Sequence, residues 1–506
     1  MNKLTIYNLS VCLETYDITV HSHLTNFLDK YYTIKSLGFS SKVGGDDKVF
    51  IGKIRNKNIF HMHSNQFVHF YHYLKEINYN LVIDEKIDKR DYYVSKADMS
   101  MRDNWVLRDN QIPIRDFLVE NPTKSKLVPL QTGFGKGIIT LAALAELKKR
   151  TAIVVLSKFA EKWIIEIAEK HNTTTKDVML IQGSKSLAGL IQMAKNNELT
   201  NNYYVFSAET LQYFLTAYET NQEDTIEQYG CSPMELFPLI GIGIMVNDES
   251  HLSFHLLYKI IVYTNVEYQI GLTATLISDN PTLKRMYKII YPSNCIYGEG
   301  QINKYIDVYP ISYTINNSNV LKLIKTTNFG SSNYSHIAFE KSISRRDILL
   351  RFYYKLIDRT IQDYYIQDYK DNDKLIIFVS TVDMASKLTS YLKEMYTDKD
   401  VRRYCQEDPY EDLINGEIVV TTVISAGTGV DIPNLRVVIQ TVSISSPQSN
   451  LQSLGRLRKL NDRDVKFCYL YCENISKQKQ YHLRRTELFR EYVASVNLRR
   501  SPVNLN

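Results

Sequence analysis

The pattern of hydrophobic and polar positions changes at about residue 100. Before it, the runs LTIYNLSVCLET and DITVHS predict strands, and KVFIGKI and NIFHMH flank a short polar turn that is typical of a β-hairpin. NQFVHFYHYLKEI instead spaces its apolar residues as a helix does. We therefore expect residues 1–100 to form a small α+β domain, and the charged run DEKIDKRD to begin the linker that follows.

Beyond this point, short apolar runs alternate with amphipathic segments. Between residues 101 and 300 the runs TAIVVLS, NYYVFS, GIGIMV and YQIGLT predict strands, and KFAEKWIIEIAEK and AETLQYFLTAY predict helices. Residues 301–476 repeat this pattern, with strands expected at KLIIFVS, EIVVTT, RVVIQTV and VKFCYLYC and a helix at SNLQSLGRLRKL. The polar, acidic segment 219–230 predicts an exposed loop. The alternation indicates two tandem α/β domains, each a doubly wound parallel sheet that binds ligands at the carboxyl ends of its strands.

Charge modifies this picture at the C-terminus. The chain carries 61 Lys and Arg against 55 Asp and Glu, a formal charge of +6. Residues 477–506 hold seven basic and two acidic residues, so most of the excess lies in this basic tail. Such a tail either contacts a phosphate backbone or forms a solvated terminal helix.

The cysteine pattern indicates the cellular compartment in which the protein works. All six are scattered, with no CxxC pair, and no secretory signal or membrane-length apolar run is evident. We therefore expect an intracellular, cytoplasmic protein that does not enter a membrane. The N-terminal histidines His61, His63, His69 and His72 raise the alternative of a metal site, but no familiar ligand spacing supports it.

The strongest local motif is QTGFGKG at residues 131–137, between an apolar run and a predicted helix. Glycines in such a loop let backbone N–H groups surround phosphates, and Lys136 would reach the outer ones. The usual hydroxyl residue after this lysine is replaced by Gly137, so water would have to take one magnesium position. The other reading is a glycine-rich turn without a ligand. The candidate phosphate-loop contacts are Thr132, Gly133, Phe134, Gly135, Lys136 and Gly137.

A pair of carboxylates follows the apolar run GIGIMV. Adjacent acids at the end of a buried strand are costly unless a cation neutralises them. Asp248 would hold Mg²⁺, and Glu249 would orient and deprotonate an attacking water. The alternative is a strand-to-loop turn with solvated acids.

Asp248-Glu249-Ser250-His251 resembles the DExH signature of superfamily 2 helicases. Further segments match the family's motifs in order. RDNQ at 108–111 resembles its adenine-reading segment, VVLSKFAEKW its first DNA-contact motif, FSAET its hydroxyl-bearing segment, and GLTAT its coupling motif. IFVST at 377–381, TT at 421–422 with AGTGVDIP at 426–433, and QSLGRLR at 452–458 resemble the motifs of the second lobe.

The resemblance implies two RecA-like domains that use ATP and Mg²⁺. It implies catalytic roles for Lys136, Asp248, Glu249, Gln452, Arg456 and Arg458, ATP contacts from Gln111, Gly429 and Asp431, and coupling through His251, Thr273 and Thr275. It implies DNA contacts from Ser157, Lys158, Ser207, Thr210, Thr381, Thr421 and Thr422. The family places its charge-stabilising arginine where this chain has Lys459, so either Arg456 or Arg458 would take that role.

Length and the small domain in front are most similar to the phage branched-DNA helicases of the UvsW type. This finer resemblance implies 3′→5′ movement on forked or four-way DNA in recombination and repair, with residues 1–100 recognising DNA structure or serving only as a docking or folding module. Two other functions stay open: an RNA helicase or a translocase subunit of a nuclease complex, and a DNA-binding scaffold that does not hydrolyse ATP.

Overall fold

The computed structural model describes residues 1–34, 48–49, 51–54, 57–130, 133–248, 254–273, 281–298, 304–327, 333–405, 408–423, 425, 432–460 and 463–504. Internal contacts divide the chain into two compact units. Unit 1 comprises Met1–Leu130 and Phe134–Gly300, and unit 2 comprises Gln301–Asn506 together with Gln131–Gly133. We call residues 101–300 lobe one and residues 301–506 lobe two.

The N-terminal residues of unit 1 form a five-stranded sheet in the order β5-β6-β2-β1-β7. Its strands pair antiparallel except β1 and β7, which are parallel. The strands are β1 (Asn2–Ile6), β2 (Ser10–Thr15), β5 (Gly52–Lys53), β6 (Ile59–His63) and β7 (Glu85–Asp88), with a small separate pair, β3 (Thr33–Ile34) and β4 (Lys48–Val49). Helices α1 (Ile18–Tyr31) and α2 (Ser64–Glu76) bury Phe27 and Phe70 in the same hydrophobic core as Met62 of β6.

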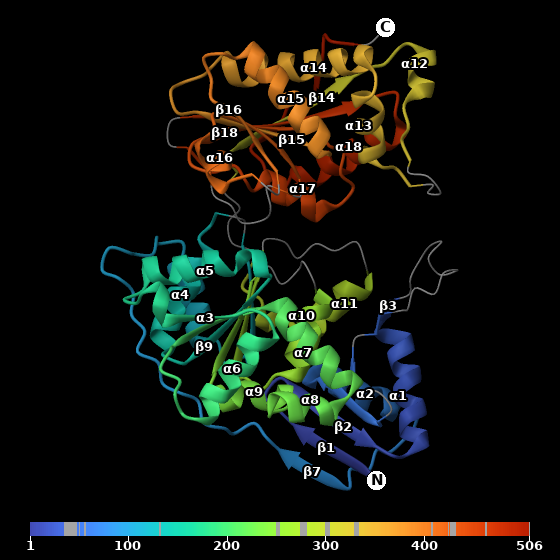
Figure 1. The fold of residues 1–506 in the computed structure, drawn as a ribbon. Coiled ribbons are helices and arrows are strands. Elements are labelled where there is room, and N and C mark those ends of the chain that lie inside the picture. Colours follow the sequence, from blue (N-terminus) through green and yellow to red (C-terminus); the bar gives the residue numbers. More distant parts are fainter. Residues whose placement is uncertain are drawn as a thin grey trace. The chain divides into compact units, whose positions relative to one another are not determined.

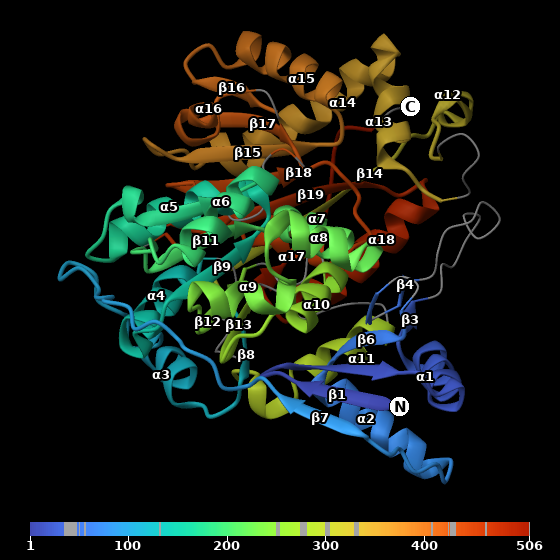
Figure 2. The same cartoon turned by 60° about the horizontal axis from the view of Figure 1, so that its bottom comes forward.

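This sheet is packed onto lobe one. His63 donates its backbone N–H to the hydroxyl of Tyr258, at 3.3 Å, and Tyr258 also hydrogen-bonds to Gln66. The amide of Asn65 donates to the carbonyl of Ile289 at 2.7 Å, where α2 lies beside α11 (Figure 2). Since the buried residues of both parts belong to one cluster, the N-terminal sheet and lobe one share a continuous core.

Lobe one contains a six-stranded sheet in which every pair is parallel, in the order β10-β11-β9-β12-β13-β8 (Figure 1). The strands are β8 (Ser125–Pro129), β9 (Thr151–Val155), β10 (Val178–Ile181), β11 (Tyr203–Ser207), β12 (Ile244–Asn247) and β13 (Tyr268–Thr273). The helices are α3 (Ile112–Glu120), α4 (Lys136–Leu147), α5 (Ser157–Lys170), α6 (Ser184–Lys195), α7 (Ala208–Thr220), α8 (Gln222–Tyr229), α9 (Pro233–Ile240), α10 (Phe254–Tyr263) and α11 (Pro281–Ile290), with short 3₁₀ turns η2 (Thr175–Asp177) and η3 (Ser293–Cys295).

Continuous apolar runs form these strands because both faces of the sheet are covered. Ile153 and Val155 of β9 belong to the core that α3, α4 and α5 complete, whereas Ala152 and Val154 belong to the core on the opposite face. The parallel α/β prediction is therefore confirmed. The loop prediction for 219–230 is wrong, because most of that segment is helix α8, which Asn221 caps at its start and Gly230 ends with φ +80°.

Lobe two repeats the architecture around an all-parallel sheet in the order β16-β17-β15-β18-β19-β14-β20, with β21 also paired to β14. The strands are β14 (Ile306–Tyr313), β15 (Lys374–Val379), β16 (Val401–Tyr404), β17 (Ile418–Thr422), β18 (Leu435–Gln440), β19 (Val465–Cys472), β20 (Ser495–Val496) and β21 (Arg499–Arg500). The helices are α12 (Ser318–Leu323), α13 (His336–Ser344), α14 (Asp347–Ile361), α15 (Val382–Met395), α16 (Tyr410–Asn415), α17 (Pro447–Leu454) and α18 (Ser476–Phe489), and a π-helical turn, η4 (Gln362–Ile366), extends α14.

The C-terminal basic segment is part of this lobe. Helix α18 packs on β19, and β20 and β21 extend the sheet beside β14. Arg485 is buried, with its guanidinium over the Tyr469 ring at 4.5 Å and a hydrogen bond of 3.2 Å to the carbonyl of Val442. At least this one of the seven basic residues therefore serves packing rather than an exposed charged surface.

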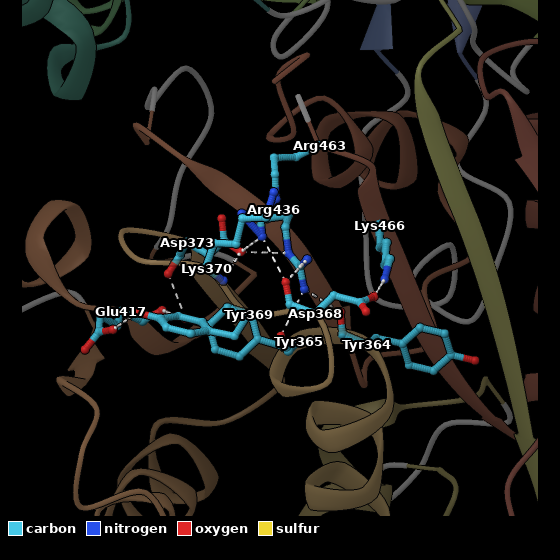
Figure 3. A network of polar contacts seen from close by, with 10 residues as sticks. All are labelled: Tyr364, Tyr365, Asp368, Tyr369, Lys370, Asp373, Glu417, Arg436, Arg463 and Lys466. Atoms are coloured by element: carbon cyan, nitrogen blue, oxygen red, sulfur yellow. Dashed lines mark hydrogen bonds and ion pairs between the residues drawn. The ribbon is translucent and has the colours of Figure 1, made fainter. Parts of the chain in front are cut away.

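A polar network holds the amino ends of β15 and β18 (Figure 3). The buried guanidinium of Arg436 contacts the buried carboxylate of Asp373 at 3.1 Å and donates to the carbonyls of Tyr364, Tyr365 and Asp368 at 2.8–3.1 Å. Arg463 reaches the same carboxylate at 2.5 Å. This network fixes the end of α14 and η4 at the edge of the sheet opposite the strand carboxyl ends, so its role is structural.

Two absences concern only the part of the chain that the structure describes. There, no helix is long and apolar enough to cross a membrane. The same residues contain no group of three or more His, Cys, Asp or Glu side chains arranged to hold a metal ion. His61 and His63 are buried in the N-terminal core, and burial lowers their pKa to about 3 and about 4.

Candidate functional site

The glycine-rich loop leads from β8 to the first residue of α4, Lys136. Gly133 and Gly135 have φ of +86° and +97°, a backbone region that favours glycine. Gly135 is the residue before α4 and offers no side chain to cap its first N–H groups. A helix start of this kind is suited to bind an anion, which supports the phosphate-loop prediction. Thr132 lies outside the described residues.

Gln111 and Arg108 hold this loop from the start of α3. The side-chain amide of Gln111 donates to the carbonyl of Phe134 at 2.7 Å, and Arg108 donates to the same oxygen at 3.0 Å. A Cβ on Gly135 would stand 2.5 Å from the Gln111 amide nitrogen, so another residue here would displace that side chain as well as strain the backbone. Phe134 packs against the core of α3, α4 and α5.

Asp248 directly follows β12, a central strand between β9 and β13. Its backbone N–H donates to the carbonyl of Val154 at 3.3 Å. One of its carboxylate oxygens accepts a hydrogen bond of 2.9 Å from the indole Nε1 of Trp163, on α5. Trp163 is buried in the core, and it also orients this carboxylate. Glu249 and His251 lie outside the described residues.

A carboxylate lies beside the position after Lys136. The carboxylate of Glu166, from α5, occupies the space beside Gly137, where a Cβ would stand 2.5 Å from the Glu166 Cδ. Asp248 and Glu166 both lie in unit 1, and each contributes a carboxylate to the candidate site. Carboxylate oxygens are ligands that Mg²⁺ prefers. The residues present therefore fit a nucleotide with its magnesium ion.

The candidate nucleic-acid contacts of lobe one gather around Glu209. Its carboxylate accepts from the backbone N–H of Ser157 at 3.0 Å and from the hydroxyls of Ser157 and Ser207 at 2.9 and 2.7 Å. Burial alone would raise the pKa of Glu209, but the hydrogen bonds from Ser207 and Ser157 hold it below its ordinary value. Thr210 is buried and accepts from the backbone N–H of Gly183 at 2.7 Å, whereas Lys158 is exposed.

Thr273 ends β13 and is buried, with its carbonyl accepting from the backbone N–H of Leu130 at 3.0 Å. This bond ties the coupling segment to the start of the glycine-rich loop. Thr275 lies outside the described residues.

In lobe two, Thr381 caps α15 by accepting from the backbone N–H of Met384 at 3.2 Å. Its hydroxyl donates to the fully buried carboxylate of Glu340 at 2.8 Å, and Ser380 donates its backbone N–H to Glu340 at 2.9 Å. Thr421 and Thr422 end β17 and are both buried, and Thr422 hydrogen-bonds to the Ser425 hydroxyl at 2.7 Å. Gly429 and Asp431 lie outside the described residues.

Helix α17 ends at Leu454, before the two candidate arginines. The helix expected through residue 460 is therefore shorter than the sequence pattern indicated. Arg456 is buried, and Arg458 donates to the carbonyls of Gly455 and Leu457. Gln452 lies within α17 and is half-buried, and Lys459 is exposed.

Two family models match the chain. Type III restriction enzyme, res subunit, matches residues 69–278, and Helicase conserved C-terminal domain matches residues 355–461. The first match contains all six strands of the sheet of lobe one, and the second contains β15, β16, β17 and β18 of the sheet of lobe two. Residues 69–278 and 355–461 thus match, in order, the two kinds of domain that superfamily 2 helicases combine.

Three known proteins that the chain resembles share no more than 24% of its residues over the aligned length. The chain is 23% identical over 406 residues to a DNA 3′-5′ helicase XPB of Kineococcus radiotolerans, covering 77% of this chain and 64% of that protein. It is 24% identical over 259 residues to a MATH and LRR domain-containing protein of Plasmodium falciparum, covering 51% of this chain and 2% of that protein. A structure of Dbp5 of S. cerevisiae bound to RNA and ADP BeF3 aligns with a TM-score of 0.48 at 15% identity, covering 78% of this chain and 90% of that one. The chain thus spans less than two thirds of both curated relatives.

Four side chains without a predicted role of their own lie beside candidate site residues, three of them in lobe one and one in lobe two. Trp163 and Glu166 lie three residues apart on α5, Glu209 lies on α7 and Glu340 on α13. The helical spacing of Trp163 and Glu166 was the only sequence signal that they share a face. Nothing in the sequence indicated which loop that face meets.

Proposed function

We propose that this chain is an ATP-dependent helicase or translocase that moves along DNA. The observation that carries the proposal is the placement of the phosphate loop and Asp248 at the carboxyl edge of one parallel sheet. Lys136 and the N-terminus of α4 would hold the outer phosphates, and Asp248 would hold the magnesium ion. Bound Mg²⁺ would neutralise the charge that develops on the transferred phosphoryl group.

Glu249 is proposed to orient the attacking water and accept its proton. Lobe two is proposed to supply Gln452, Arg456 and Arg458 to catalysis and Gly429 and Asp431 to nucleotide binding. Coupling to nucleic acid would pass through His251, Thr273 and Thr275. In lobe one, Thr273 ends β13 and Ser207 ends β11, so the coupling and DNA-contact segments would respond together to a shift at the carboxyl edge of the sheet.

The substrate proposal is branched or forked DNA with 3′→5′ movement. The XPB relative is named a DNA 3′-5′ helicase, which favours DNA and this direction. We propose residues 1–100 as a DNA-structure recognition domain, 101–300 and 301–476 as the two motor lobes, and 477–506 as a basic segment. Contacts to DNA would be made mainly to its backbone, so little sequence preference is expected.

The deciding experiment measures ATP hydrolysis by the purified chain alone and with single-stranded DNA, a four-way junction or RNA. Stimulation by DNA that disappears in Glu249→Gln and Lys136→Ala supports the proposal. Stronger stimulation by RNA would change the substrate to RNA. Tight DNA binding without hydrolysis under any condition would replace the motor by a DNA-binding scaffold.

A further inference from the structure

The side chain of Glu166 occupies the space beside Gly137 that a larger residue there would need. Gly137 lies in the first turn of α4, directly after the phosphate-binding Lys136, and carries no side chain. Glu166 fills the space that a side chain on Gly137 would need, with its Cδ 2.5 Å from the ideal Cβ position and its carboxylate oxygens reaching the same space. A serine or threonine hydroxyl at residue 137 would compete for this volume. The carboxylate therefore stands where the Cβ of a serine or threonine at residue 137 would be.

The surroundings of Glu166 hold it in this position. Its carboxylate pairs with Lys170, one turn later on α5, at 2.7 Å, and both side chains are largely shielded from solvent. Trp163 lies one turn earlier on the same helix and donates to Asp248. One face of α5 thus contacts both Gly137 in the phosphate loop and Asp248 at the strand end.

We propose that Glu166 supplies the oxygen ligand for magnesium that Gly137 lacks, so that a carboxylate from α5 replaces a hydroxyl from α4. This inference rests on the proposed ATP site. It has an electrostatic consequence that a hydroxyl would not have. Glu166 carries a negative charge, so it repels the phosphates of a nucleotide without metal and favours the nucleotide bound to Mg²⁺. Nucleotide binding should therefore depend unusually strongly on the metal.

The test measures equilibrium binding of a fluorescent ADP analogue to the full chain, in excess Mg²⁺ and in EDTA. Glu166→Gln removes the charge and one strong oxygen donor. We expect it to weaken binding in Mg²⁺ by about tenfold or more and to leave binding in EDTA unchanged or stronger. Mn²⁺ affinity in the presence of ADP, followed by electron paramagnetic resonance, should fall by a similar factor.

Two matched controls separate ligation from structure. Lys170→Gln breaks the ion pair but keeps the Glu166 carboxylate, and Glu169→Gln removes an exposed charge from the same helix. Both should keep the metal dependence of the wild type. If Lys170→Gln lowers Mn²⁺ affinity as much as Glu166→Gln does, Glu166 acts only through the ion pair and the inference is overturned.

A rescue variant gives an independent test. Gly137→Ser in the Glu166→Ala background restores an oxygen donor and leaves room for it, so the double variant should recover Mg²⁺-dependent binding lost in Glu166→Ala. Gly137→Ser alone should be impaired by overlap with Glu166. If wild type binds ADP with Mg²⁺ and Glu166→Gln binds it identically in both conditions, the inference fails while the proposed function stands. If wild type binds no nucleotide at all, the proposed function itself fails.

Discussion

The indole nitrogen of Trp163 donates a hydrogen bond of 2.9 Å to the carboxylate of Asp248, joining α5 to the carboxyl end of β12. A buried tryptophan that bonds a carboxylate at this place restrains the rotation of the carboxylate. The hydrogen bond orients one carboxylate oxygen of Asp248. The packing of α5 is therefore part of the candidate metal site.

Replacing Trp163 by Phe keeps an aromatic ring in the core but removes this donor. We expect the Mg²⁺ concentration needed for half-maximal ATP hydrolysis to rise about tenfold, because hydrogen-bond partners of metal ligands tune their affinity. The measurement is hydrolysis as a function of Mg²⁺ concentration. Trp105→Phe is the control, since Trp105 is the other tryptophan and its indole donates to the backbone carbonyl of Glu169 rather than to a carboxylate. An unchanged Mg²⁺ requirement in Trp163→Phe would show that Asp248 needs no such support.

Glu209 ties together two segments proposed to contact DNA. Glu209→Gln removes the negative charge that strengthens the hydrogen bonds from Ser157 and Ser207, so the starts of α5 and α7 should be held together less firmly. We expect DNA-stimulated hydrolysis to fall about tenfold, with hydrolysis in the absence of DNA changed much less. Glu161→Gln, an exposed glutamate on α5, is the matched control. Equal losses with and without DNA would place Glu209 in general folding instead.

The parallel sheets were predictable because buried strands in such sheets are apolar on both faces. An apolar run between two predicted helices is typical of such a strand, as in Ala152, Ile153, Val154 and Val155 of β9. Helix α8 was missed because its polar composition outweighed its start and stop signals, Asn221 and Gly230. Asn221 and Gly230 indicated the helix more reliably than the polar composition of the segment did.

The candidate site was predictable only where it is built from consecutive residues. A phosphate loop or a strand-end acid can be recognised in the sequence because the residues of the motif are consecutive. Glu166, Glu209 and Glu340 lie on helices whose sequence pattern indicates a buried face but not the residues that it meets. Helix α17 also ended earlier than its pattern indicated, because Gly455 follows Leu454 and the chain leaves the helix there.

Asp373 is predicted to be essential for the stability of lobe two. Asp373→Asn would leave the buried guanidinium of Arg436, and that of Arg463, without the charge that compensates them. Breaking such a buried pair costs about 3–5 kcal/mol. Urea unfolding followed by circular dichroism should show the loss, while tryptophan fluorescence, which reports only unit 1 because both tryptophans lie there, should not. The neighbouring exposed Asp371→Asn should be silent in both.

Glu340 makes the stability of lobe two depend on pH. Its carboxyl is fully buried, and burial raises its pKa to about 7 from 4.5 despite hydrogen bonds from Ser380 and Thr381. The unfolded chain loses this proton near pH 4.5, whereas the folded chain keeps it until about pH 7. Between these values the folded state binds more protons, so the free energy of unfolding falls as pH rises, by up to about 3 kcal/mol.

Glu340→Gln should remove this dependence because the amide stays neutral at every pH. We expect the wild type to lose stability relative to Glu340→Gln between pH 5 and about pH 7.5, measured by urea unfolding and circular dichroism across this range. Glu394→Gln removes an exposed carboxylate from α15 and should follow the wild type at each pH. Parallel curves for wild type and Glu340→Gln would mean that Glu340 is ionised throughout, with the N–H of Ser380 and the hydroxyl of Thr381 stabilising its charge fully. In that case Glu340 would resemble Glu209, where hydrogen bonds outweigh burial and lower the pKa.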